Sequence, residues 1–171
     1  MQKRTVYIGA AAVGAVFAWY LFRPERLFIN VTVDEQFPVA AAGREGVVTA
    51  AADVVASGQF HGVAHGAKGT AAIYRLPDGK RVLRFTGFET SNGPDVQVYL
   101  VAASDANDNA TVTDAGFVNV GALKGNVGDQ NYDLPAEVDL AKYKAVTIWC
   151  RRFGVNFATA PLGAPTEAGR G

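Results

Sequence analysis

The chain has 171 residues, of which 49% are hydrophobic, and this is enough apolar material for one domain with a buried core. Its 19 glycines and single methionine favour short strands and tight turns over a helical bundle. The formal net charge is zero, yet residues 1–26 hold four basic side chains and one acidic one, so the remainder is acidic, with 12 basic and 15 acidic groups. This balance, without any basic stripe, argues against nucleic-acid binding.

Residues 6–22 form an uncharged apolar run near the N-terminus. As a helix this run spans about 25 Å at roughly 1.5 Å per residue, which is at the short end of what a bilayer requires. Tyr7 lies near one end, and Trp19 and Tyr20 lie near the other, as interfacial aromatic residues do. Because no small-residue cleavage pattern follows, we expect residues 1–26 to be an uncleaved, single-pass membrane anchor rather than a removed signal peptide, with the rest of the chain extracytoplasmic.

Residues 27–57 are expected to form a spacer between this anchor and the folded domain. Within it, an alanine-rich stretch from residue 47 to Gly58 is compatible with a short helix that ends at the glycine, or with an extended tether. At the other end of the chain, residues 163–171 carry no apolar pattern and are expected to be disordered.

Residues 58–162 show the pattern of an all-β domain. Short apolar or alternating runs are separated by turn residues, among them Pro77-Asp78-Gly79 and the segment 92–95. The predicted strands cover residues 60–65, 70–76, 80–88, 96–102, 117–123, 130–134, 143–150 and 155–160. Strands of this length with regular turns predict an antiparallel β-sandwich or barrel of about 7–8 strands.

Cys150 is the only cysteine, so the chain forms no internal disulfide. On a strand it shares a face with Val146 and Ile148, which favours a packed, chemically quiet thiol. Against this, Cys150 ends its strand and is followed by Arg151 and Arg152, whose positive charges favour a thiolate. The residues alone leave both interpretations open.

The two histidines, His61 and His65, have the spacing of a helical metal pair, but the adjacent glycines argue against a helix. On a straight strand they lie about 13 Å apart, too far to share a zinc ion. At most one of them can join Cys150. A type-one copper site needs a second histidine and an axial ligand, and the only methionine is Met1. We therefore predict no metal site built from protein side chains alone.

Four stretches together carry a family resemblance: HGAKGTAAIYRL (65–76), NGPDVQVYL (92–100), LKGNVGDQNYDLP (123–135) and VTIWCRRFGVNFATAPL (146–162). In this order they resemble the DM thirteen domain of Skeletor-type proteins, from about Gly58 to Leu162. Bacterial members often carry one N-terminal anchor. The resemblance implies electron transfer centred on a characteristic cysteine, here Cys150, as a bare thiol or as a ligand to a prosthetic group such as haem.

The resulting hypothesis is a membrane-anchored extracytoplasmic domain with a redox role, more an electron-transfer or binding module than a stand-alone enzyme. Cys150 is its centre, Arg151 is expected to stabilise the thiolate, and His65, which lies in the matched segment 65–71, is expected to help bind a cofactor. The cofactor is unknown, with haem possible, and the partners are the membrane, through residues 6–22, and an unknown redox protein. The alternative is a non-catalytic cell-surface interaction domain in which Cys150 is structural.

Overall fold

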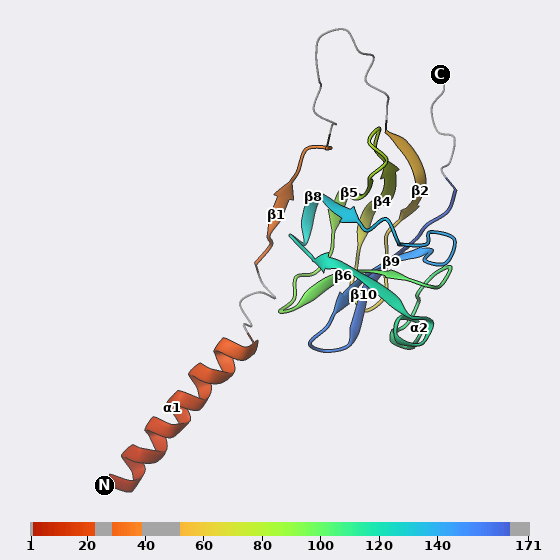
Figure 1. The fold of residues 1–171 in the computed structure, drawn as a ribbon. Coiled ribbons are helices and arrows are strands. Elements are labelled where there is room, and N and C mark those ends of the chain that lie inside the picture. Colours follow the sequence, from red (N-terminus) through yellow and green to blue (C-terminus); the bar gives the residue numbers. More distant parts are fainter. Residues whose placement is uncertain (1, 23–28, 39–51, 165–171) are drawn as a thin grey trace.

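The computed structural model describes residues 2–22, 29–38 and 52–164 of the chain. It consists of an N-terminal helix and two packed β-sheets (Figure 1). The prediction of a disordered tail falls almost wholly on residues 165–171, and about half of the predicted spacer falls on residues 27–28 and 39–51. These segments lie outside the described residues.

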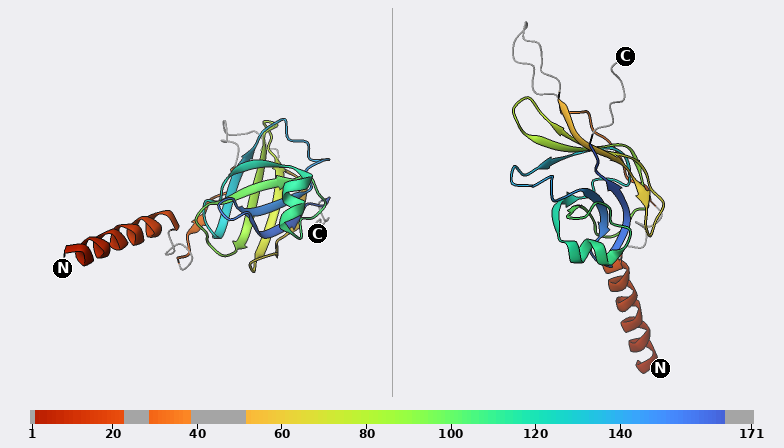
Figure 2. Two further views of the ribbon diagram at one scale, coloured as in Figure 1. Left: turned by 90° about the horizontal axis from the view of Figure 1, so that it is seen from below. Right: turned by 90° about the vertical axis from the view of Figure 1, so that its right-hand side faces the viewer.

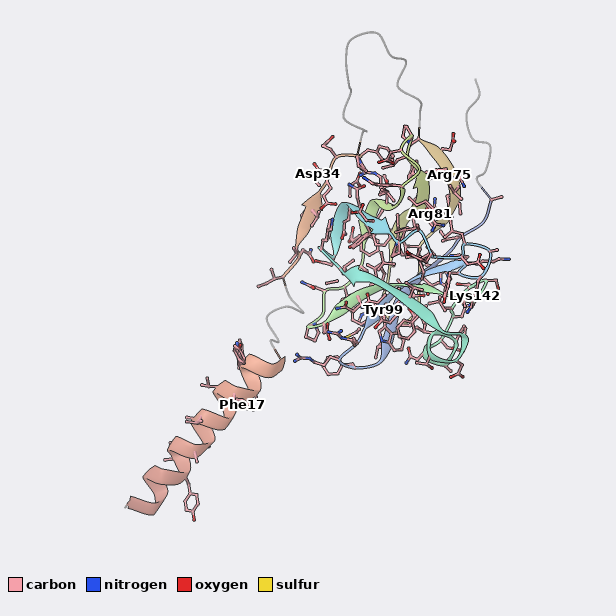
Figure 3. All side chains as sticks on the ribbon, in the orientation of Figure 1. Phe17, Asp34, Arg75, Arg81, Tyr99 and Lys142 are labelled. Atoms are coloured by element: carbon pink, nitrogen blue, oxygen red, sulfur yellow. The ribbon has the colours of Figure 1, made fainter. Side chains whose placement is uncertain are left out.

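Helix α1 (Gln2–Phe22) contains the apolar run, and its apolar side chains point in all directions around the axis. Residues 7–20 are exposed, and Figure 3 shows Phe17 pointing away from the rest of the chain. Within the ranges that the structure describes, no helix combines the length and the apolar character needed to cross a membrane. The membrane anchor therefore stays a prediction, whereas the helix itself is confirmed.

The first sheet has the strand order β1-β8-β5-β4-β2. Its strands are β1 (Thr32–Asp34), β8 (Val127–Leu134), β5 (Arg81–Glu89), β4 (Lys68–Arg75) and β2 (Asp53–Gln59). The short strand β1 runs parallel to β8, and all the other neighbours are antiparallel. The predicted turn at Pro77-Asp78-Gly79 joins β4 to β5, where Asp78 Oδ1 accepts a hydrogen bond from Lys80 N and Gly79 adopts a positive φ of 84°.

The second sheet has the strand order β3-β10-β9-β6-β7 and is antiparallel throughout. Its strands are β3 (His61–Gly62), β10 (Val155–Pro161), β9 (Ala145–Cys150), β6 (Val96–Val101) and β7 (Phe117–Ala122). Figure 2 shows the two sheets stacked face to face, so the architecture is a sandwich.

The core lies between the sheets and is rich in aromatic rings. Phe85 packs edge-on against Phe60 and tilted against Phe88, with ring centroids 5.0 Å apart in both pairs. The aliphatic side chains of β6 and β9 close the core from the second sheet. Edge-to-face rings add about 0.5–1.5 kcal/mol per pair beyond the area they bury.

A short helix that the sequence patterns did not indicate covers the outer face of the second sheet. Helix α2 (Asn109–Ala115) begins after Asp108, whose side chain accepts a hydrogen bond from Thr111 N. Its buried Val112 packs in a second apolar cluster with Tyr99 and Trp149. For this reason every residue of β9 is buried, on both faces of the strand.

The predicted β-sandwich is confirmed, with two five-stranded sheets in place of the 7–8 strands expected. The additional strands include β1, which lies wholly in the predicted spacer, and β2, which lies mostly in it. Residues 53–59 form a strand and not the short helix with which the alanine-rich stretch is compatible, because they pair with residues 70–75 of β4. At Gly58 a side chain would meet the Pro161 carbonyl oxygen, with a Cβ only 1.8 Å away, so glycine is what lets β2 approach β10 here.

Candidate functional site

Cys150 is the last residue of β9 and has no exposed surface. In the strand pairing it lies between Val96 of β6 and Val155 of β10. It belongs to the core cluster that contains Val146 and Ile148, as the alternation of the strand predicted. The thiol is therefore at the end of a strand yet fully enclosed by side chains.

A cavity of about 550 Å³ lies directly beside this strand end. The turn at residues 92–95 forms one of its walls, and Val96, Leu123 and Lys124 contribute others. Val96 thus both lines the cavity and pairs with Cys150. The thiol lies behind the cavity wall, next to the valine that forms it.

Arg151 leaves β9 on the face opposite to Cys150 and pairs with Asp95. Its Nε donates to Asp95 Oδ2 at 2.9 Å, and its backbone N–H donates to the Asp95 carbonyl oxygen, also at 2.9 Å. The hydrogen bond and the charge of Asp95 raise the pKa of Arg151 above its ordinary value, which keeps the guanidinium charged. This Asp95–Arg151 pair ties the 92–95 turn to the end of β9. The stabilisation of a Cys150 thiolate by the charge of Arg151 stays a prediction.

His65 is half-buried and packs on Phe157 of β10, with ring centroids 4.1 Å apart. The ring of Phe157 also lies under Gly93, where an added Cβ would come within 3.2 Å of it. His65 therefore reaches the neighbourhood of the site through Phe157 rather than by a bond to Cys150. His61 has a different partner, because its Nε2 lies 3.0 Å from Asp105 Oδ1.

Three aromatic rings on the outer face of the second sheet were missed by the sequence reasoning. Tyr99 stacks on Phe117 with ring centroids 4.2 Å apart, and Trp149 lies 6.3 Å from Tyr99 on the other side. Figure 3 shows Tyr99 over the middle of this sheet. Burial raises the pKa of Tyr99. The sequence does place one aromatic residue on each of three predicted strands. These residues can be recognised as a cluster only when the strand order β9-β6-β7 is known.

Residues 59–162 match the family model described as electron transfer DM13. The chain belongs to the DM13 family. This match confirms the resemblance found in the sequence. The matched residues span the sandwich from the end of β2 to the end of β10. No curated protein and no solved structure matches the chain.

The DM13 domain in this conformation does not fit a haem bound through Cys150. An axial ligand must face a cavity that admits the macrocycle, and the thiol is instead enclosed by core side chains. The lining of the adjacent cavity contains no imidazole, thiol, thioether or phenol group. Over the described ranges, no three His, Cys, Asp or Glu side chains are grouped to hold a metal ion.

Proposed function

We propose that this DM13 domain transfers electrons through the bare thiol of Cys150. The observation that carries the proposal is the position of Val96, which pairs with Cys150 and also lines the cavity. In this proposal, displacement of Val96 at this strand end brings the thiol to solvent. The family match supplies the class of function, electron transfer, and the enclosure of the thiol favours a bare sulfur over a haem ligand.

The chemistry that suits a single thiol is exchange with a partner disulfide. The Cys150 thiolate attacks one partner sulfur, the partner S–S bond breaks, and a mixed disulfide forms. The displaced sulfur leaves as a thiolate and takes up the proton that Cys150 released. The thiolate of a second reactant, such as a small thiol, then attacks the partner sulfur of the mixed disulfide, forms a new disulfide with it and releases Cys150 as a thiolate. Two electrons pass from this second thiol to the original partner disulfide, and no second cysteine of this chain is needed.

Access to the thiol is proposed to depend on the Asp95–Arg151 pair. This pair joins the 92–95 turn to the residue after Cys150, and the side chain of Arg151 is 61% exposed. An exposed ion pair contributes little to stability, so in this proposal the strand end opens without global unfolding. In this proposal Arg151 positions the turn over the thiol instead of stabilising the thiolate.

We also propose that residues 6–22 hold the domain at a membrane, with the sandwich on the extracytoplasmic side. The support is the set of apolar side chains on α1 that no other part of the described chain covers, among them Val13, Phe17 and Trp19. An extracytoplasmic compartment is also where partner disulfides persist.

The test is the rate at which Cys150 of the folded full-length chain reacts with a small alkylating reagent and with glutathione disulfide, followed by mass spectrometry. We expect slow modification of the native protein and a rate about two- to fivefold higher for Arg151→Gln, the factor that corresponds to losing an exposed ion pair. The matched control is Lys68→Gln, which breaks the exposed Lys68–Glu89 pair away from β9.

If Cys150 reacts only as fast as the whole protein unfolds, and Arg151→Gln leaves that rate unchanged, the redox proposal is wrong. The complete burial of Cys150 then favours the second candidate, a binding domain in which the cysteine is a core residue. The exposed aromatic side chains of Phe117 and Phe153 would be its contact residues.

A further inference from the structure

The point where the chain enters the sandwich lies at the same end as Cys150. Asn92 Nδ2 donates to the Ile29 carbonyl oxygen at 2.9 Å, so the segment that follows α1 is bonded to the 92–95 turn. The same turn is bonded to Arg151 through Asp95. Ile29, the 92–95 turn and the turn at residues 151–154 are therefore neighbours, whatever the direction of α1.

This end of the domain exposes apolar and cationic side chains together. The exposed fractions are 55% for Ile29, 43% for Val31 and 53% for Phe153, a large part of the exposed bulky apolar surface of the sandwich. Arg151 and Arg152 precede Phe153, and in the described part of the chain no ion pair is formed by Arg152. We call this surface the basic end, defined as Ile29, Val31, Arg151, Arg152 and Phe153.

We propose that the basic end docks on an anionic lipid bilayer. This inference rests on the proposed membrane attachment through residues 6–22, and it adds the orientation of the domain. Six residues separate Phe22 from Ile29, so the two residues lie at most about 25 Å apart even when the connection is fully extended. The basic end is thus the part of the sandwich that the connection keeps nearest to the membrane.

Charge favours the same orientation. Residues 27–171 carry 12 basic and 15 acidic groups, so an anionic surface repels the sandwich as a whole. At the basic end Asp95 balances the charge of Arg151, so Arg152 supplies the net positive charge. Its attraction to an anionic bilayer fades within a Debye length of about 8–10 Å. Phe153, at the tip of the turn, can enter the boundary between headgroups and acyl chains, as aromatic residues of interfacial segments do.

The opposite end of the sandwich provides the control position. Strand β5 runs from Arg81, beside the Pro77-Asp78-Gly79 turn, to Glu89, close to the 92–95 turn. Its eight residue steps place these two turns about 26 Å apart, and Figure 1 shows them at opposite ends of the sandwich. Asp78 is therefore held well away from any surface that Phe153 contacts.

The experiment measures tryptophan quenching in the full chain, reconstituted in vesicles of phosphatidylcholine and phosphatidylglycerol with brominated acyl chains. A Trp19→Phe background removes the helix tryptophan and leaves the buried Trp149 as a constant baseline. We expect the tryptophan of Phe153→Trp to be quenched and that of Asp78→Trp to be unaffected. Arg152→Gln should lower the ratio of docked to undocked protein about fivefold, the effect of one basic side chain near an anionic surface, whereas Lys80→Gln should not.

Trp19 of the unsubstituted chain reports separately on the helix. Quenching of Trp19 without quenching at position 153 overturns the docking proposal and leaves the membrane attachment in place. This is the result expected if the basic end binds an acidic protein and not the bilayer. Quenching at neither position overturns both proposals. Quenching at position 153 that is lost in purely zwitterionic vesicles or at high salt supports the proposal. Neither result depends on the reactivity of Cys150, which is tested by alkylation.

Discussion

Cys150 is surrounded by core side chains although the residue after it begins an exposed turn. A buried sulfur behaves as a small apolar group, and its reaction requires that a neighbouring segment moves. Val96 pairs with Cys150, and the Asp95–Arg151 pair joins the 92–95 turn to the residue after it. We therefore expect the stability of this strand end, as well as the chemistry of the thiol, to set the reactivity of Cys150.

This burial predicts an ordering of stability for two substitutions at position 150. Cys150→Ala removes one heavy atom and leaves a small apolar void, whereas Cys150→Ser places a hydroxyl among the side chains of the apolar core cluster. We expect Cys150→Ser to lower the free energy of unfolding by about 1–3 kcal/mol, and by more than Cys150→Ala does. Urea unfolding of the full chain measures both. A serine variant as stable as the alanine variant would mean that the hydroxyl reaches water.

The sequence was sufficient to predict the direction of Cys150 but not the partners of Arg151 or His65. Alternation along a strand is a local property, so the shared face of Val146, Ile148 and Cys150 followed from it. Asp95 lies 56 residues before Arg151, and its role depends on the pairing of β6 with β9. Phe157 meets His65 only because β3 joins the edge of β10.

At the scale of elements, β1 illustrates what strand patterns miss. It has three residues, and it forms because β8 offers an edge and because side chains far along the chain hold it there. Asn126 Oδ1 accepts from Val31 N, and Lys124 Nζ donates to Glu35 Oε1 at 2.7 Å. Hydrogen bonds from Lys124 and Asn131 N outweigh the desolvation of Glu35 and lower its pKa. No window of the sequence contains these partners together with the strand.

The approach of β1 to β8 depends on Gly128. This residue has a φ of 103°, and an added Cβ would lie 2.0 Å from the Val33 carbonyl oxygen. Gly79 also has a positive φ, but nothing lies within 4 Å of the Cβ it would gain. We expect Gly79→Ala to cost about 1–2 kcal/mol from backbone strain alone, and Gly128→Ala to cost clearly more because β1 must move away.

Urea unfolding of the two glycine variants and the unsubstituted chain tests this difference. Amide hydrogen exchange at Val33 and Glu35 adds a local measurement, since those groups should lose protection in Gly128→Ala and keep it in Gly79→Ala. Equal losses of stability, with protection retained in both variants, would show that β1 is not restrained by its contact with β8.

At the scale of the whole molecule, α1 and the sandwich differ in how they place their apolar residues. The sandwich buries its apolar residues between its own sheets, whereas the apolar side chains of residues 7–20 in α1 are exposed. The matched family region also begins well after α1, at residue 59. The two parts should therefore be separable without loss of the fold.

Deletion of residues 1–28 is expected to move the protein from the membrane fraction to the aqueous fraction in zwitterionic vesicles at high salt, conditions in which the basic end does not bind. The Tm of the sandwich should change by less than about 4 °C, the shift that a loss of 1 kcal/mol produces in a domain of this size. Val13→Lys with Phe17→Lys in the full chain is the matched control, because it removes apolar surface from α1 without shortening the chain. A large fall in Tm on deletion would mean that α1 packs on the sandwich. Truncated protein that stays with the vesicles would mean that residues 6–22 are not what attaches the protein to the membrane.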